Sequence, residues 1–157
     1  MRRKELYDSA TPSGISTMVH NLQKLAILIG KETYKALASE ILQQVSQAIE
    51  KHPTSFSKWA NAMINEVYPM LEIAVVGADA LTLSQQIQQL YVPNKVLMAT
   101  VEGNSAYPLL KGKLTVNSSD TKKTPQNTTQ IYVCQNYACK LPVNSIQAFK
   151  KLVNYNL

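Results

Sequence analysis

The sequence contains few of the residues on which metal centres depend. Its 157 residues include two cysteines, Cys134 and Cys139, and two histidines, His20 and His52. A structural zinc site takes about four ligands, and both histidines fall in the N-terminal half of the chain, away from the cysteines. We therefore expect no metal site.

Glycine is also scarce, and the glycine-rich motifs that bind phosphate groups are missing. Gly77 follows the apolar run EIAVV without the further glycines of a dinucleotide fingerprint, and there is no Walker pattern. Two interpretations of Gly77 stay open, an ordinary strand-to-helix turn or a phosphate site at the N-terminus of the next helix. We expect no cofactor.

Long apolar runs are absent too. None approaches the roughly 18–20 residues of a membrane-spanning helix. The N-terminal stretch MRRKELYDSATPSG has basic residues with no apolar segment behind them, which excludes a signal peptide here, although upstream sequence could carry one. With only two cysteines, the chain fits a reducing compartment, so we expect a cytoplasmic location and no membrane partner.

Acidic residues are outnumbered by basic ones, and the net charge is +6. Such an excess can attract nucleic acid. The positive residues are scattered, however, and form no basic stripe interleaved with aromatic residues. We expect a solvated basic surface and no nucleic-acid partner.

The first half of the chain has the apolar periodicity of helices. Apolar residues recur at three- and four-residue spacing over 16–29, over 32–51 and between HPTS and Pro69. Ser13 is placed to cap the first helix and Gly30 to end it. The short connection at Gly30 predicts an antiparallel helical hairpin.

The second half alternates strands with helices. Short apolar runs at 71–77, 95–101 and 130–134 predict strands, and helical spacing recurs at 81–92 and 145–153. A short helix is expected near 107–110, and 117–129 is polar and rich in turn residues, which predicts a flexible insertion. The fold class is therefore a mix of α+β and α/β, with N-terminal helices at 1–68 and a small three-layer α/β unit at 69–157 whose sheet is mainly parallel.

Two stretches hold candidate site residues. In QIYVCQNYACKLP the cysteines are spaced C-x4-C, unlike the C-x-x-C of redox motifs. This spacing favours the interpretation that the cysteines are small packing residues at a strand-to-loop corner. A disulfide is possible if Gln135 and Asn136 turn the chain. A reactive thiol is the third interpretation. Asp8 and Ser13 precede the first helix, where they would face a cleft or form a turn and an N-cap.

These two stretches also carry a family resemblance. LYDSATPSGIS at 6–16 resembles the YD-x-A-x-PSGNS signature of the spermatogenesis-associated protein 20 family, also called YyaL-like proteins. IYVCQNYAC followed by proline at 131–142 resembles the YVC-x-N-x-x-C…P segment near the C-terminus of that family. HPTSF, EIAVVG and VPNKV fall between them in the expected order, so the resemblance covers nearly the whole chain apart from 117–129.

The resemblance implies a C-terminal fragment of a longer protein. In the family a thioredoxin-like domain comes first, followed by an α/α toroid similar to six-hairpin glycosidases. Residues 1–68 would then be the last helices of the toroid, and 69–157 a small unit appended to it. The missing upstream toroid and thioredoxin-like domain of the same protein are the implied partners, and the chain alone is expected to be non-catalytic.

The signature residues are site candidates by that resemblance. They are Asp8, Pro12, Ser13, Gly14 and Ser16 in the first segment and Cys134, Asn136 and Cys139 in the second. Ile15 stands where the family usually has asparagine, so an amide that lines the toroid cleft would be lost here. The alternative function is part of a carbohydrate-active enzyme, an epimerase or a glycosidase, whose cleft includes 6–16 and uses Asp8 as acid or base.

Three helices cannot complete a toroid, so part of their apolar surface should lack a partner. We expect Phe56, Trp59 and the stripe from Leu22 to Ile29 to form an exposed patch unless 70–157 covers it. A homodimer through the exposed helical faces is the other possible cover.

Overall fold

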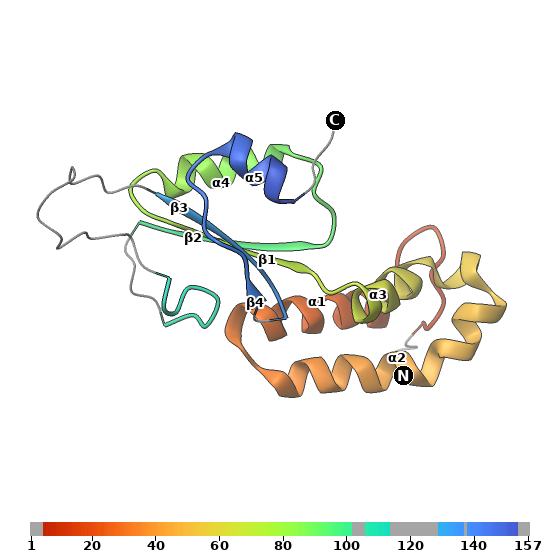
Figure 1. The fold of residues 1–157 in the computed structure, drawn as a ribbon. Coiled ribbons are helices and arrows are strands. Elements are labelled where there is room, and N and C mark those ends of the chain that lie inside the picture. The colour runs from red at the N-terminus through yellow and green to blue at the C-terminus, as the bar shows by residue number, and fades with distance from the viewer. Residues whose placement is uncertain (1–4, 102–105, 114–128, 137, 154–157) are drawn as a thin grey trace, which may run out of the picture. The chain divides into compact units, whose positions relative to one another are not determined.

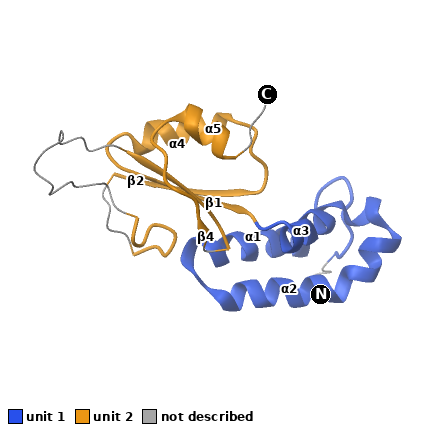
Figure 2. Cartoon of the chain, in the orientation of Figure 1, with its two compact units in different colours: residues 1–69 blue, residues 70–157 orange. Residues whose placement is uncertain are grey.

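A computed structural model describes residues 5–101, 106–113, 129–136 and 138–153. The chain divides into two compact units, Met1–Pro69 and Met70–Leu157 (Figure 2). Each unit has its own cluster of buried apolar residues. None of the helices in the described ranges is long and apolar enough to cross a membrane.

The first unit is helical. Its elements are α1 (Gly14–Ile29), α2 (Glu32–Lys51), a 3-10 turn η1 (Pro53–Phe56) and α3 (Ser57–Val67). The Ser13 side chain accepts a hydrogen bond from the backbone N–H of Ser16 and caps α1. Gly30 ends α1 with φ 64°, a left-handed conformation that glycine adopts without steric cost. The expected helices and their caps are confirmed.

The core of the first unit draws on all of its helices. Trp59 and Phe56 are 0% and 1% exposed and pack with Val19, Ala38 and other apolar residues of α1 and α2. The Trp59 ring N–H also donates to the backbone oxygen of Leu6 at 2.8 Å. The expectation that these two aromatic residues lie in an exposed patch is wrong, because η1 and α3 return onto α1 and α2.

The second unit is a sheet with two helices. Its elements are β1 (Leu71–Val76), α4 (Ala80–Gln89), β2 (Lys95–Thr100), β3 (Gln130–Gln135), β4 (Ala138–Cys139) and α5 (Ile146–Leu152). The strand order is β2-β1-β3-β4. α4 and α5 lie on the same side of the sheet and contact each other (Figure 1).

The sheet is mixed, which corrects the expectation of a mainly parallel one. β1 and β2 are parallel, as expected for a β-α-β unit, but β3 is antiparallel to both β1 and β4. Gln135 of β3 pairs with Ala138 of β4, and so short a separation in the sequence permits only an antiparallel pair. The expected helix near 107–110 is a turn instead, in which the N–H groups of Leu110 and Lys111 both donate to the Tyr107 oxygen.

The two faces of the sheet have different neighbours. Ile73, Val75, Ile131 and Val133 belong to the core cluster that includes α4 and α5, and Phe149 of α5 is fully buried in it. Because side chains alternate along a strand, Glu72 and Cys134 point to the other face. Within the second unit, the described helices α4 and α5 lie on one face, so a three-layer unit is not confirmed. The insertion expected at 117–129 lies outside the described residues except for Thr129.

Candidate functional site

The carboxylate of Asp8 joins the N-termini of two helices. Its Oδ1 accepts the backbone N–H of Ser13 at 2.8 Å and the hydroxyl of Ser16 at 2.9 Å, next to the start of α1. Its Oδ2 accepts the backbone N–H of Lys58 at 2.8 Å, in the first turn of α3. The backbone N–H of Asp8 donates to the Ser55 oxygen at 2.8 Å. Both carboxylate oxygens are therefore engaged, and the side chain is 8% exposed.

Asp8 is held in its ionised form. Burial raises the pKa of Asp8, but hydrogen bonds from Ser13, Ser16, Lys58 and Trp59 outweigh burial and keep the pKa below its ordinary value of 3.8. Donors to a carboxylate favour its charged form, and a helix N-terminus stabilises a negative charge further. At neutral pH the group is thus an ionised carboxylate whose two oxygens both accept hydrogen bonds, which suits a helix cap better than a general acid.

The other residues of the first signature surround this cap. Ser13 and Ser16 are buried and contact Asp8 directly. Pro12 and Gly14 are exposed, and a side chain added at Gly14 would meet nothing within 4 Å. Ile15 is half-buried and packs against the core of the first unit, so the residue that departs from the family pattern takes an apolar packing position.

His20 is a further polar residue of this region, and sequence reasoning gave it no partner. Its Nε2 lies 2.9 Å from the backbone oxygen of Lys58 and donates to it when protonated at that nitrogen. Burial lowers the pKa of His20, as do the charges of Lys58 and Lys24, against the opposing effect of this hydrogen bond. Asp8 and His20 thus hold the backbone of Lys58 through its N–H and its oxygen.

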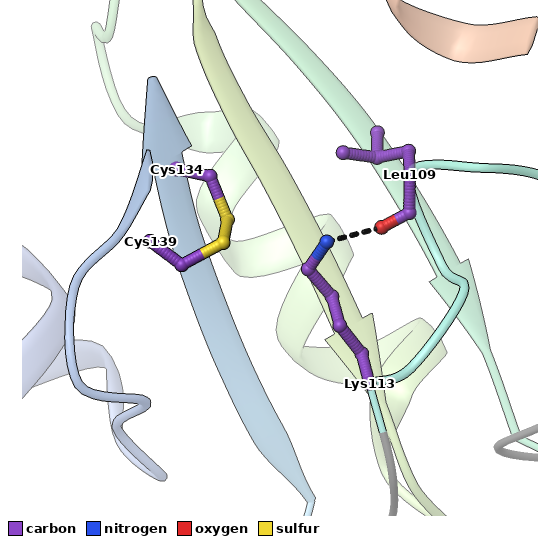
Figure 3. Close-up of a disulfide and its surroundings, with 4 residues drawn as sticks. All are labelled: Leu109, Lys113, Cys134 and Cys139. Atoms are coloured by element: carbon purple, nitrogen blue, oxygen red, sulfur yellow. Dashed lines mark hydrogen bonds between the residues drawn. A yellow bond between two sulfur atoms is a disulfide. The ribbon is translucent and has the colours of Figure 1, made fainter. Parts of the chain in front are cut away.

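The two cysteines form a disulfide. Cys134 on β3 and Cys139 on β4 are directly opposite in the strand register, with their Cα atoms 3.9 Å apart (Figure 3). The backbone N–H of Lys140 donates to the Val133 oxygen, so the cysteines occupy the neighbouring non-hydrogen-bonded pair, where Cα atoms approach most closely. The favoured prediction, that the two cysteines are separate packing residues, is therefore wrong.

The turn between the cysteines includes Asn136. Its φ is 49°, in the left-handed region that asparagine tolerates better than most residues. The sequence allowed a disulfide if the chain turns at Gln135 and Asn136, and the turn at Asn136 meets that condition. Closing so short a loop contributes about 2 kcal/mol on the chain-entropy model, which is less than a longer loop would contribute.

A lysine and a glutamate lie on the disulfide's face of the sheet. Glu72 of β1 is opposite Cys134 in the register and is 7% exposed. The Lys113 ammonium donates to the Leu109 oxygen at 2.5 Å (Figure 3). Burial lowers the pKa of Lys113, and the charge of Glu72 opposes this.

Gly77 is accounted for by packing. Its φ is 136°, and a Cβ there would lie 2.6 Å from the Cα of Thr129. The Thr129 hydroxyl accepts the backbone N–H of Asp79 at 2.8 Å, and the N–H of Gly77 donates to the Thr100 oxygen at 3.0 Å. Donors that a phosphate would need are occupied, so the strand-to-helix turn is the better interpretation. Among the described residues there is no group of three or more potential metal ligands.

In comparisons with known proteins, the chain is similar to part of much longer proteins. It is 27% identical over 158 aligned residues to spermatogenesis-associated protein 20 of Homo sapiens, and 25% identical to the proteins of that name in Rattus norvegicus and Mus musculus. Each alignment covers 98% of this chain and 20% of the relative, so the chain spans about a fifth of the length of the curated relatives it matches.

The other comparisons return nothing. No family model matches the chain, and no solved structure does. The resemblance to spermatogenesis-associated protein 20, expected from the two signature segments, is nevertheless confirmed along nearly the whole chain.

Proposed function

We propose that this chain is the C-terminal packing module of a longer protein similar to spermatogenesis-associated protein 20, and that it has no catalytic activity by itself. In this proposal, residues 1–68 are the last helices of an α/α toroid. The upstream toroid and the thioredoxin-like domain of the same protein are its partners. The alignments support the proposal because four-fifths of each relative lies outside the matched region.

The observation that carries the proposal is an apolar stripe on α1, made of Met18, Leu25 and Ile29. These side chains are 54%, 40% and 39% exposed. Their spacing of seven and four residues puts them on one side of the helix, next to the buried side that includes Leu22. A helix with so wide an apolar surface ordinarily packs against a further element. We assign that place to a preceding helix of the longer protein.

Asp8 has a structural part in this proposal. Its contacts to the starts of α1 and α3 hold α1, which carries the stripe, beside α3 within the first unit. A carboxylate whose two oxygens both accept hydrogen bonds and whose pKa is lowered is poorly suited to donate a proton to a sugar. The carbohydrate-active alternative and the homodimer stay predictions from the sequence, as does the cytoplasmic location.

The proposal is tested with the double substitution Met18→Ser and Leu25→Ser in two contexts, this chain alone and the longer protein. Burying an apolar side chain contributes roughly 1.5–3 kcal/mol, so we expect the longer protein to lose about 2–4 kcal/mol of unfolding free energy and the chain alone to lose little. Leu141→Ser is the matched control, since Leu141 is 86% exposed in the second unit. Equal effects in both contexts would reject a packing role for the stripe.

A further inference from the structure

We propose that the Cys134–Cys139 disulfide is a thiol–disulfide exchange site, at which an external dithiol attacks the Cys139 sulfur and Cys134 is the leaving group. This inference concerns the second unit and goes beyond the packing role proposed above. It rests on three features of the β3–β4 hairpin, namely unequal exposure of the two cysteines, the charged groups on their face of the sheet, and hydrogen bonds that outlast the S–S bond.

The two cysteines differ in access to solvent. Cys134 is 2% exposed and lies between β1 and β4 in the sheet, whereas Cys139 is exposed on the two-residue strand β4. In thiol–disulfide exchange the attacking thiolate must reach one of the two sulfur atoms. It approaches that sulfur from the side away from the sulfur that leaves. Cys139 is the more accessible of the two residues, so burial favours attack at its sulfur.

The leaving sulfur has a cation in its neighbourhood. Cys134 is opposite Glu72 in the register, and the Lys113 side chain is among the surroundings of the disulfide drawn in Figure 3, with its ammonium on the Leu109 oxygen. A nearby ammonium stabilises a thiolate, and a more stable thiolate leaves faster. Glu72 acts in the opposite sense. Lys140 is adjacent to Cys139 in sequence, but its ammonium donates to the Leu152 oxygen at 2.8 Å, where α5 ends.

The hairpin has hydrogen bonds that do not depend on the disulfide. The N–H of Lys140 donates to the Val133 oxygen at 3.0 Å. Ile131 and Val143 exchange two backbone hydrogen bonds, at 2.6 and 3.0 Å. These bonds keep the segment after β4 beside β3 when the S–S bond is open. The reduced cysteines therefore stay paired, and the disulfide can form again without refolding.

The exchange balances as follows. A thiolate of the dithiol bonds to Cys139 Sγ while the Cys134–Cys139 bond breaks, and its electron pair goes to Cys134 Sγ, which takes a proton from solvent. In the mixed disulfide, the first sulfur of the dithiol is bonded to Cys139 Sγ. The second thiolate of the dithiol then attacks that first sulfur, and Cys139 Sγ is the leaving group. The dithiol leaves as a disulfide, and Cys139 Sγ takes up a proton. Two electrons pass from the dithiol to the protein, and an oxidised dithiol runs the sequence in reverse.

The first test identifies the sulfur that is attacked. Folded protein is incubated briefly with glutathione, whose mixed disulfide with the protein is trapped by acid quenching, and the adduct is located by peptide mass spectrometry. We expect the adduct on Cys139, at least about tenfold in excess over Cys134, because Cys134 is buried and Cys139 is exposed. An adduct mainly on Cys134, or reaction only after unfolding in guanidinium, would overturn the proposal. Circular dichroism after full reduction by dithiothreitol should show an unchanged fold.

The second test uses paired charge variants and the rate of reduction by dithiothreitol. Lys113→Met should slow reduction about threefold or more, and Glu72→Gln should accelerate it, because the two charges act on the Cys134 thiolate in opposite senses. Lys140→Met is the control and should change the rate less than twofold. A general loss of structure would move Lys113→Met and Glu72→Gln in the same direction, so a shared direction, or equal slowing in Lys113→Met and Lys140→Met, would reject the assignment.

Discussion

Lys58 and Asp8, 50 residues apart in the chain, are joined by a hydrogen bond of 2.8 Å from the backbone N–H of Lys58 to the Asp8 Oδ2. The other carboxylate oxygen binds Ser13 and Ser16 at the start of α1. One side chain therefore supplies acceptors to two helices that are distant in sequence. The first signature segment has a physical purpose even without any reaction, since it fixes how α1 and α3 begin.

Replacing Asp8 should destabilise the first unit. Each lost helix cap costs about 0.5–2 kcal/mol, and the substitution also leaves buried donors without an acceptor. We expect Asp8→Ala to lower the unfolding free energy by about 2–4 kcal/mol, measured by urea denaturation of the chain. Asp79→Asn is the control, because Asp79 precedes α4 without a side-chain cap bond and should change stability by less than about 0.5 kcal/mol. Equal losses in the two variants would contradict the cap.

The same carboxylate predicts a pH dependence. Because the pKa of Asp8 is lower in the folded chain than its ordinary value of 3.8, its contribution is fully present well above pH 3.8. It is lost as the pH falls through the folded pKa. The stability difference between the wild type and Asp8→Ala should therefore be constant from pH 7 to 5 and shrink in strong acid. A difference that persists unchanged at the lowest measurable pH would contradict a titrating cap.

Protonation of His20 should lower the stability of the folded chain at a higher pH than protonation of Asp8 does. Its pKa is lowered in the folded chain from an ordinary value of 6.5, so the unfolded chain binds more protons as the pH falls through 6.5 and the folded state loses stability. We expect the wild type to lose more stability than His20→Gln between pH 7.5 and 5.5. An NMR titration of the His20 ring should give a pKa below 6.5. A value above 6.5 would show that the hydrogen bond to Lys58 dominates over burial.

Gly77 and Gly14 provide a matched pair of glycine substitutions. A Cβ at Gly77 would meet the backbone of Thr129 at 2.6 Å with φ at 136°, whereas a Cβ at Gly14 meets nothing within 4 Å. Gly77→Ala should therefore destabilise the second unit by more than about 2 kcal/mol. Gly14→Ala in α1 should be neutral or stabilising by up to about 1 kcal/mol. Thermal unfolding of both variants measures this, and a neutral Gly77→Ala would mean that Thr129 can move away.

Local patterns in the sequence were sufficient for most helices and for the β1-α4-β2 unit. Ser13 marks the start of α1 by its side-chain hydroxyl, and Gly30 marks its end because a residue without a side chain adopts the left-handed conformation easily. A strand of EIAVV followed by a helix predicts its parallel partner. The direction of β3 could not be predicted, because alternation along a strand is the same for parallel and antiparallel pairs. β4 has two residues, too few for any periodicity.

The contacts that make up the candidate site could not be predicted from the spacing of residues in the sequence. Asp8 was a candidate beside Ser13, but its partner Lys58 lies in another helix and binds through its backbone, which carries no side-chain signal. The disulfide depended on whether Asn136 turns the chain, and asparagine permits a positive φ without requiring it. Lys113 was not singled out, because the turn that precedes it replaces the helix expected there.

Oxidation of Met18 tests the central claim most directly. In this chain Met18 is 54% exposed and Met70 is 4% exposed. Hydrogen peroxide should therefore convert Met18 to the sulfoxide much faster than Met70 when the chain is alone, with peptide mass spectrometry as the readout. In the longer protein, a preceding helix should cover Met18 and bring its rate down toward that of Met70. Equally fast oxidation of Met18 in the longer protein would contradict a packing role for this surface.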